Sequence, residues 1–134
     1  MTEDTITITL PWPDFDLLGG NARGKLRDRM KATRAAKNIG AACALEAGGH
    51  IFRGRNPSGT AAKVRVCVEF QPPTERAPDD DNAIKALKPF RDGIASVIRI
   101  DDNPKRWLVS YAFGQRHRPA KGPAGRVIVT ITRI

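Results

Sequence analysis

Strict alternation of apolar and polar residues recurs along this chain and constrains its fold more than any other feature. The alternation runs through Thr5–Leu10 and again through Val64–Phe70, and β-branched residues are frequent in both segments. A period of two places alternate side chains on one face, so both segments predict half-buried strands. Two more strands are predicted towards the end of the chain, at Trp107–Phe113 and Arg126–Ile131.

Between these strands, two segments change to the helical spacing of three and four residues. The first, Leu26–Ala47, ends at Gly48 and Gly49, as helices commonly do. The second runs over Asn82–Val97, and Pro89 within it predicts either a kink or a fresh start. The face expected to be buried on the first helix consists of Ala32, Ala35, Ala36, Ile39, Ala42 and Cys43. The apolar stripe of the second consists of Ile84, Leu87, Ile94 and Val97.

The resulting order of elements, β-α-β-α-β-β, contains no repeat and no sign of a domain boundary. A sheet with one apolar face needs another layer to cover that face. Hydrophobic residues make up 40% of the chain, which is typical of a globular protein. We therefore expect residues 1–134 to form a single α+β domain, in which a mixed β-sheet of about four strands packs against two main helices.

The chain has a large excess of positive charge, with 23 Lys and Arg residues against 14 Asp and Glu and a net charge of +9. Such a charge favours polyanionic partners, and nucleic acid is the commonest of these. No segment approaches the ~20 apolar residues needed to span a bilayer. The acidic start, Met1-Thr-Glu-Asp4, does not resemble a signal peptide. We therefore expect a cytoplasmic protein with no membrane partner.

The two cysteines, Cys43 and Cys67, lie singly within apolar segments. In a reducing cytosol this pattern predicts small buried hydrophobic residues rather than a disulfide. With only His50 and His117 and no close cysteine pair, the sequence does not predict a structural zinc site. It also lacks a phosphate-cradling glycine loop, a Gly-x-Ser-x-Gly elbow and a dinucleotide fingerprint, so other enzyme classes have little support.

The run Asp79-Asp80-Asp81-Asn82 precedes the second predicted helix. Its three adjacent carboxylates repel one another, and a bound divalent cation would remove that repulsion. Magnesium prefers hard oxygen ligands, usually one or two carboxylates together with water and phosphate oxygens. In an extended segment Asp79 and Asp81 would point the same way and share a cation. The alternative is that Asp81 or Asn82 caps the helix and the other acids stabilise its positive end.

A second acidic pair, Asp101 and Asp102, follows the same helix, and a reversal of the chain there would return it towards Asp79 and Asp81. A carboxylate-bound metal activates water and neutralises phosphate charge, and a nearby lysine stabilises the charge that develops during phosphodiester hydrolysis. The spacings of four, three and four residues predict one polar stripe on the helix, formed by Asp81, Lys85, Lys88 and Asp92.

The pattern Asp79-x-Asp81-Asn82-x-x-Lys85, followed by Asp92-Gly-Ile94 and Asp101-Asp102, resembles the RusA-like Holliday-junction resolvases, a family of crossover junction endodeoxyribonucleases. The opening Ile6-Thr-Ile-Thr-Leu-Pro11 is also similar to that family's first strand and the proline after it, so the resemblance covers nearly the whole chain. The family often has a polar segment with asparagine and tyrosine after this proline, and residues 12–21 depart from it.

The resemblance implies a homodimeric, magnesium-dependent endonuclease, with Mn²⁺ as a substitute metal, that nicks two opposed strands of branched DNA at a four-way junction. The family's catalytic, metal-binding carboxylates fall on Asp79, Asp81 and Asp102, and Asp101 is a neighbouring candidate ligand. Its essential lysine falls on Lys85 when counted forward from the asparagine, and on Lys88 when counted backward from the last aspartate of the helix.

Recognition of a junction is expected to rest on phosphates and shape rather than on base sequence. Trp12 and Phe15 are candidates to wedge into the junction, although aromatic residues of this kind more often cover the core. The basic residues expected to contact DNA are Arg23, Lys25, Arg27, Lys31, Arg34, Arg53, Arg55, Arg116, Arg118 and Lys121.

Two other functions are compatible with the same residues. One is a magnesium-dependent nuclease of similar architecture that cuts flaps, single strands or simple duplex. The other is a non-catalytic nucleic-acid-binding protein, in which Asp79 and Asp81 have only a structural role.

Overall fold

The computed structural model describes residues 5–20, 23–50, 63–76 and 79–134, and it confirms the expected α+β fold. One sheet is formed by β1 (Thr5–Pro11), β2 (Val64–Gln71), β3 (Trp107–Phe113) and β4 (Arg126–Arg133). The helices of the described residues are α1 (Phe15–Leu18), α2 (Leu26–Glu46) and α4 (Asp80–Ile98). None of the described helices is long and apolar enough to cross a membrane.

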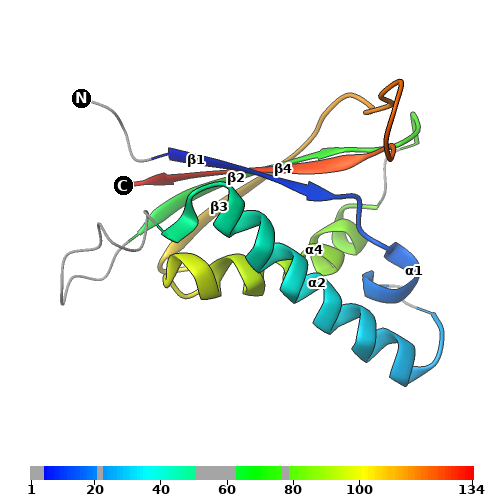
Figure 1. The fold of residues 1–134 in the computed structure, drawn as a ribbon, viewed down its shortest axis with the longest axis horizontal. Helices are drawn as coiled ribbons and strands as arrows, with labels where there is room; N and C mark the ends of the chain where they lie inside the picture. Colours follow the sequence, from blue (N-terminus) through cyan, green and yellow to red (C-terminus); the bar gives the residue numbers. More distant parts are fainter. Residues whose placement is uncertain (1–4, 21–22, 51–62, 77–78) are drawn as a thin grey trace.

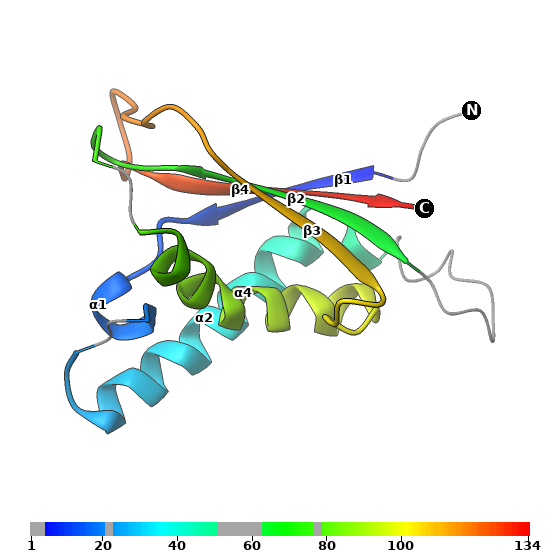
Figure 2. The ribbon, with the colours of Figure 1, turned by 180° about the vertical axis from the view of Figure 1, so that it is seen from behind.

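The sheet is mixed, with the strand order β1-β4-β2-β3. Strand β4 pairs antiparallel with both β1 and β2, whereas β3 pairs parallel with β2. A parallel pair needs a long crossover connection, and α4 provides it between β2 and β3. Both views place the helices on one face of the sheet (Figures 1 and 2). The start of α4 therefore lies at the carboxyl end of β2, on the same side of the molecule as α1.

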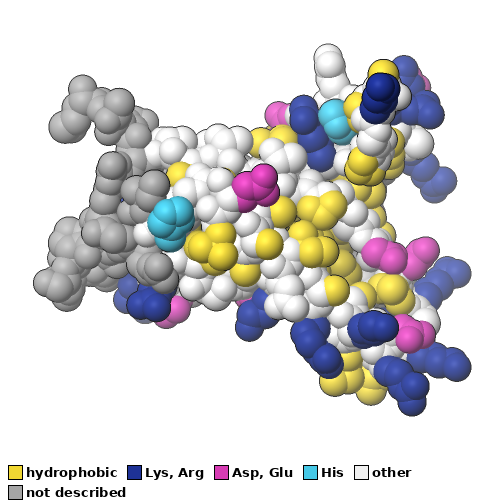
Figure 3. All heavy atoms as spheres, in the orientation of Figure 1, with side chains coloured by type: hydrophobic (Ala, Val, Ile, Leu, Met, Phe, Trp, Pro, Cys, Tyr) yellow, Lys and Arg dark blue, Asp and Glu magenta, His cyan; other side chains and the backbone are white. Residues whose placement is uncertain are grey.

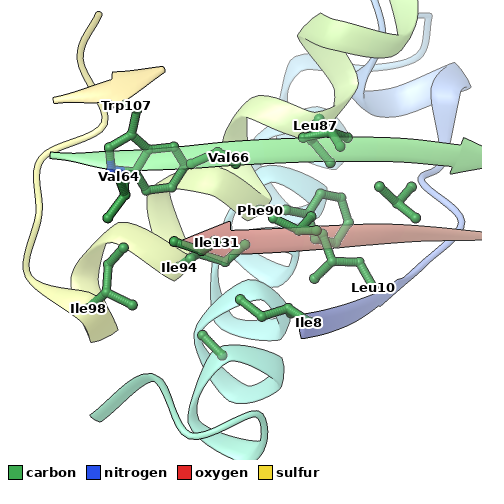
Figure 4. Close-up of a cluster of buried hydrophobic side chains, with 14 of the residues drawn as sticks. Ile8, Leu10, Val64, Val66, Leu87, Phe90, Ile94, Ile98, Trp107 and Ile131 are labelled. Carbon is green, nitrogen blue, oxygen red and sulfur yellow. The ribbon is translucent and has the colours of Figure 1, made fainter. Parts of the chain in front are cut away.

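The core lies between the sheet and the helices, and it follows from the period of two in the strands. Along β2 the residues Val64, Val66, Val68 and Phe70 are buried, whereas the residues between them are exposed or half-buried. The predicted stripe of α4 is confirmed, since Leu87, Ile94 and Val97 are buried and Ile84 is half-buried. Figure 4 shows a cluster of these buried hydrophobic side chains, and the residues labelled there are Ile8, Leu10, Val64, Val66, Leu87, Phe90, Ile94, Ile98, Trp107 and Ile131.

Several local predictions were wrong. Residues 14–25, whose glycines Gly19, Gly20 and Gly24 predict a loop, contain the short helix α1. Asp14 accepts a hydrogen bond from the backbone N–H of Asp16 and caps this helix. Pro89 lies inside a continuous α4 rather than at a break. Cys67 is exposed on the uncovered face of β2, although both cysteines are unpaired as expected.

The buried face of α2 also differs from the predicted one. Ala36 is buried, but Ala35, Ile39 and Ala42 are exposed, because the contact with α4 runs through Gly40. A Cβ atom on Gly40 would overlap the carbonyl oxygen of Phe90 in α4. A Cβ atom on Gly93 would likewise overlap the carbonyl oxygen of Lys37 in α2. The two glycines therefore let the helix backbones approach more closely than any other residue would allow.

We predict that Gly93→Ala lowers the free energy of unfolding by about 1–3 kcal/mol, because the added methyl group must separate two packed backbones. Gly20→Ala is a matched control, since its Cβ would lie 3.7 Å from Lys85 Cδ in ordinary contact. That control is expected to change stability by less than about 1 kcal/mol. Urea unfolding of both variants measures the difference, and equal stabilities would show that the close helix crossing is not a constraint.

Candidate functional site

The three adjacent aspartates lie at the start of α4 with their side chains exposed. Asp79 is the N-cap residue in an extended conformation, and its carboxylate makes no capping hydrogen bond. Asp80 and Asp81 already belong to the helix, so the expectation of an extended segment with Asp79 and Asp81 on one side was wrong. The alternative in which Asp81 or Asn82 is the cap was also wrong, because both lie within the first turn.

Within the described part of the chain, no ion pair involves Asp79, Asp80 or Asp81. The acids interact favourably with the positive end of the helix dipole, but that effect is worth only ~0.3–1 kcal/mol per charge at an exposed site. Three unneutralised carboxylates at one helix end are therefore available to a cationic ligand.

Helix α1 packs directly against this acidic helix end. A Cβ atom on Gly19, which follows α1, would overlap both the Asn82 side-chain oxygen and the carbonyl oxygen of Phe15, so glycine lets the two elements approach closely. Phe15 contacts Trp12 with their ring centroids 5.4 Å apart, and both pack on the core. The interpretation of Trp12 and Phe15 as core aromatics is thereby confirmed, and these residues hold α1 beside α4.

The two candidate lysines of α4 have different surroundings. Lys88 Nζ lies 2.9 Å from Asp92 Oδ1 and 2.9 Å from Asp102 Oδ2. Partial burial lowers the pKa of Lys88, but the hydrogen bonds to Asp102 and Asp92 outweigh burial, so its pKa is raised overall. A raised pKa keeps Lys88 charged at neutral pH and unsuited to act as a base. Lys85 is exposed and has no ion pair within the described residues.

Asp102 belongs to a network between α4 and β3. Its side chain is only 3% exposed, and Arg91 Nη2 donates to its second oxygen at 2.5 Å. Arg91 Nη1 donates to the Tyr111 hydroxyl at 2.6 Å, and the guanidinium carbon lies 5.6 Å from the centre of the Trp107 ring. Burial raises the pKa of Tyr111, which therefore stays a neutral phenol. Both Asp102 oxygens are thus engaged by cationic side chains.

The structure does not gather the predicted metal ligands into one cluster. No three His, Cys, Asp or Glu side chains converge on a point among the described residues. Asp102 contacts Lys88, which lies two helical turns from Asp81, about 10 Å along the axis. Asp101 is exposed. The fit to magnesium is therefore partial: one or two carboxylates at the start of α4 match what this ion usually takes from a protein, but Asp102 is already neutralised.

The predicted DNA-binding residues that the structure describes are on the surface. Arg23, Lys25, Arg27, Lys31 and Arg34 are exposed in and before α2. Arg53 and Arg55 lie outside the described residues. Figure 3 shows Lys and Arg side chains gathered at one end of the molecule, over the first half of α2 and over the loop before β4. That loop carries Arg116, Arg118 and Lys121, and Arg116 lies 3.5 Å from the exposed carboxylate of Glu75.

Sequence reasoning did not find Arg91 or Tyr111. Arg91 lies beside the predicted polar stripe of α4 rather than on it, and its partners Asp102 and Tyr111 are 11 and 20 residues away. The sequence signal was only that a charged residue, Arg91, lies between the apolar residues Phe90 and Ile94 of the helix. This signal does not identify the partners of Arg91.

The fold and this site define a single-sheet α+β protein with an acidic helix terminus beside basic surfaces. Over 135 residues the chain is 38% identical to an uncharacterized protein of Xylella fastidiosa (strain Temecula1 / ATCC 700964). The match covers 96% of this chain and 76% of that relative, so the chain belongs to the same family as the Xylella protein. No protein-family model matches the chain.

We predict that Asp102→Asn lowers the free energy of unfolding by about 1–3 kcal/mol, because it leaves the partly buried Arg91 without its counter-charge. Asp101→Asn removes a charge from the adjacent exposed residue and is expected to change stability by less than about 0.5 kcal/mol. Chemical unfolding of the two variants measures the difference. An Asp102→Asn variant as stable as the control would show that this carboxylate is free for another role.

Proposed function

We propose that this protein is a magnesium-dependent endodeoxyribonuclease, similar to the RusA-like Holliday-junction resolvases, that cuts branched DNA in the cytoplasm by metal-assisted phosphodiester hydrolysis. The observation that carries the proposal is the group of three exposed carboxylates, Asp79 to Asp81, at the start of α4. They have no cationic partner in the described chain, although the protein has a net charge of +9. No ion pair within the described chain relieves the repulsion between these carboxylates, and a bound divalent cation would relieve it.

Asp79 and Asp81 are the residues proposed to hold Mg²⁺, with Mn²⁺ as a substitute. The bound ion would supply an activated water and neutralise charge on the scissile phosphate. Lys85 lies one turn further along α4 from Asp81, where its ammonium group can contact a phosphate and stabilise developing negative charge. The exposure of Lys85 favours it over Lys88, whose charge is already neutralised by Asp92 and Asp102.

Asp102 has a positioning role in this proposal. By binding both Lys88 and Arg91, its carboxylate connects the segment before β3 with the middle of α4 and fixes the helix that carries the acidic terminus. Its implied role as a metal ligand stays a prediction, and the contacts that occupy both of its oxygens do not favour it.

The basic surfaces support DNA as the substrate. Cationic side chains on the first half of α2 and on the 114–125 loop lie at the same end of the molecule as the start of α4 (Figures 1 and 3). Paired nicks in a four-way junction would require two active sites related by a two-fold axis, so the proposal includes a homodimer.

We expect the purified protein to nick a labelled four-way junction on two opposed strands in the presence of Mg²⁺ and not in EDTA. Asp81→Asn should reduce cleavage by at least about 100-fold while DNA binding persists, because the loss is of a metal ligand rather than of a DNA contact. Asp28→Asn, which removes an exposed acid from the first turn of α2, is the matched control and should cut normally.

Equal cleavage of linear duplex and junction would retain the nuclease and remove the junction preference. DNA binding without cleavage under Mg²⁺ or Mn²⁺ would contradict the nuclease. It would leave a non-catalytic DNA-binding protein, a second candidate favoured by the absence of any three-residue metal cluster among the described residues.

The two lysines give a separate prediction. Lys85→Met should lower the cleavage rate by about 100-fold without loss of stability, because an exposed cation near the phosphate is removed. Lys88→Met should instead lower stability, by less than about 1 kcal/mol since Lys88 is half exposed, with a much smaller effect on cleavage. Single-turnover cleavage and urea unfolding of both variants make the comparison, and the opposite pattern would assign the catalytic role to Lys88.

A further inference from the structure

A cleft lies between α1, the first half of α2 and the start of α4, with a volume of about 520 Å³. This size is within the range of pockets that bind drug-sized ligands. Gly19 and Gly20 form one wall, and Lys85 of α4 reaches into it. Both ribbon views place the three elements side by side, next to the acidic helix end (Figures 1 and 2).

Helix α2 contributes one continuous face to this cleft. The lining positions Arg29, Thr33 and Lys37 follow one another at a spacing of four, and Leu26, Met30 and Arg34 form the adjacent row. Arg27 and Lys31, which are equally exposed cations of the same helix, do not line the cleft. Arg34 follows Lys31 by three residues and Arg27 by seven, so the basic surface of the helix is continuous and the cleft takes up one side of it.

The charge of the cleft favours an anion. Four cations, Arg29, Arg34, Lys37 and Lys85, line it, and no acidic residue does. Arg29 Nε is buried and has no hydrogen-bond partner within the described residues. Four positive charges held close together repel one another, so a phosphate-bearing ligand would stabilise the arrangement.

The same cleft is also apolar. Leu26 is 63% exposed and Met30 is 56% exposed, and both lie among the lysines and arginines. Duplex DNA presents phosphates and sugars to a protein surface and keeps its bases stacked inside. An unpaired strand presents its phosphates to a positively charged groove, and it also exposes the apolar faces of its bases, which the aliphatic side chains of the cleft can contact.

We propose that this cleft binds an unpaired segment of DNA, with Arg29, Arg34 and Lys37 contacting its phosphates and Leu26 and Met30 contacting a base. The position of Lys85, one turn or about 6 Å along the axis from Asp81, directs such a strand past the acidic end of α4. The idea that the strand is led to the acidic end of α4 rests on the proposed function. Binding in the cleft does not, because it is measured without metal.

The test compares charge removal inside and outside the cleft. Binding of a labelled thymidine oligonucleotide is measured by fluorescence anisotropy in EDTA over a range of salt concentrations, after circular dichroism has confirmed that the variants fold. Arg34→Ala with Lys37→Ala should weaken binding about tenfold or more, and should reduce the magnitude of the log–log salt slope by about 1.4 through the loss of two phosphate contacts. Lys63→Ala with Lys105→Ala, the control with the same loss of charge at exposed positions outside the cleft, should weaken binding by less than about threefold.

An abasic oligonucleotide of the same length tests the apolar contact. Leu26→Ser with Met30→Ser should weaken binding of the thymidine strand several-fold and leave binding of the abasic strand and of blunt duplex unchanged. Equal losses from the two charge pairs would overturn the cleft in favour of a general positive field. If the Leu26→Ser, Met30→Ser variant binds the thymidine strand as tightly as the parent protein does, the base contact would be overturned.

The two proposals fail in different ways. Normal cleft behaviour with no cleavage under Mg²⁺ or Mn²⁺ would remove the nuclease and leave the single-strand site. Junction cleavage together with an unchanged single-strand affinity of the Arg34→Ala and Lys37→Ala variant would retain the nuclease and overturn the cleft. A matched RNA strand that binds more tightly than the DNA strand would overturn the assignment to DNA.

Discussion

Helices α2 and α4 cross so closely that a methyl group on Gly40 or Gly93 would overlap a backbone carbonyl of the opposite helix. Side chains at a helix crossing normally keep the two helix axes about 8–10 Å apart. Glycine has no side chain beyond a hydrogen atom, so the axes can come closer where both helices have glycine at the contact. The close contact fixes α2 on α4, and α4 is itself fixed to the sheet as the crossover between β2 and β3. The first half of α2 is thereby held beside Lys85, which creates the cleft.

The acidic residues of the proposed site lie in two different electrostatic environments. The side chain of Asp102 is almost fully buried and neutralises Lys88 and Arg91, so removing its charge would leave the partly buried Arg91 without a counter-charge. Asp79 and Asp81 are exposed, and water screens their mutual repulsion only in part. A buried and paired carboxylate mainly fixes the structure, whereas an exposed and unpaired one remains free to bind a ligand. This difference is the physical basis for assigning position to Asp102 and chemistry to Asp79 and Asp81.

Both long helices and all four strands of the sheet were predicted from the sequence. For the helices and the first two strands the signal was periodicity, because burial of one face is encoded locally in each segment. It did not predict α1, whose four residues are too few for a periodic signal. It also misplaced the buried face of α2, because alanines occur around that helix and the contact through Gly40 depends on Gly93 of a distant segment. In the site, the local run of aspartates was visible, but the contacts of Arg91 with residues far along the chain were not.

The distribution of charge connects the binding surface with the chemistry. A phosphate backbone drawn to the cations of α2 would meet the exposed carboxylates at the start of α4, and like charges at this distance repel. The repulsion would oppose close approach of the scissile phosphate unless a divalent cation held by Asp79 and Asp81 neutralised it. Binding and cutting would then depend differently on metal. The cleft, lined by Arg34 and Lys37, would hold DNA without a metal ion. Close contact between the scissile phosphate and Asp81 would require the metal ion. In the proposed mechanism, the arrangement would separate the attraction of DNA from the step that breaks its backbone.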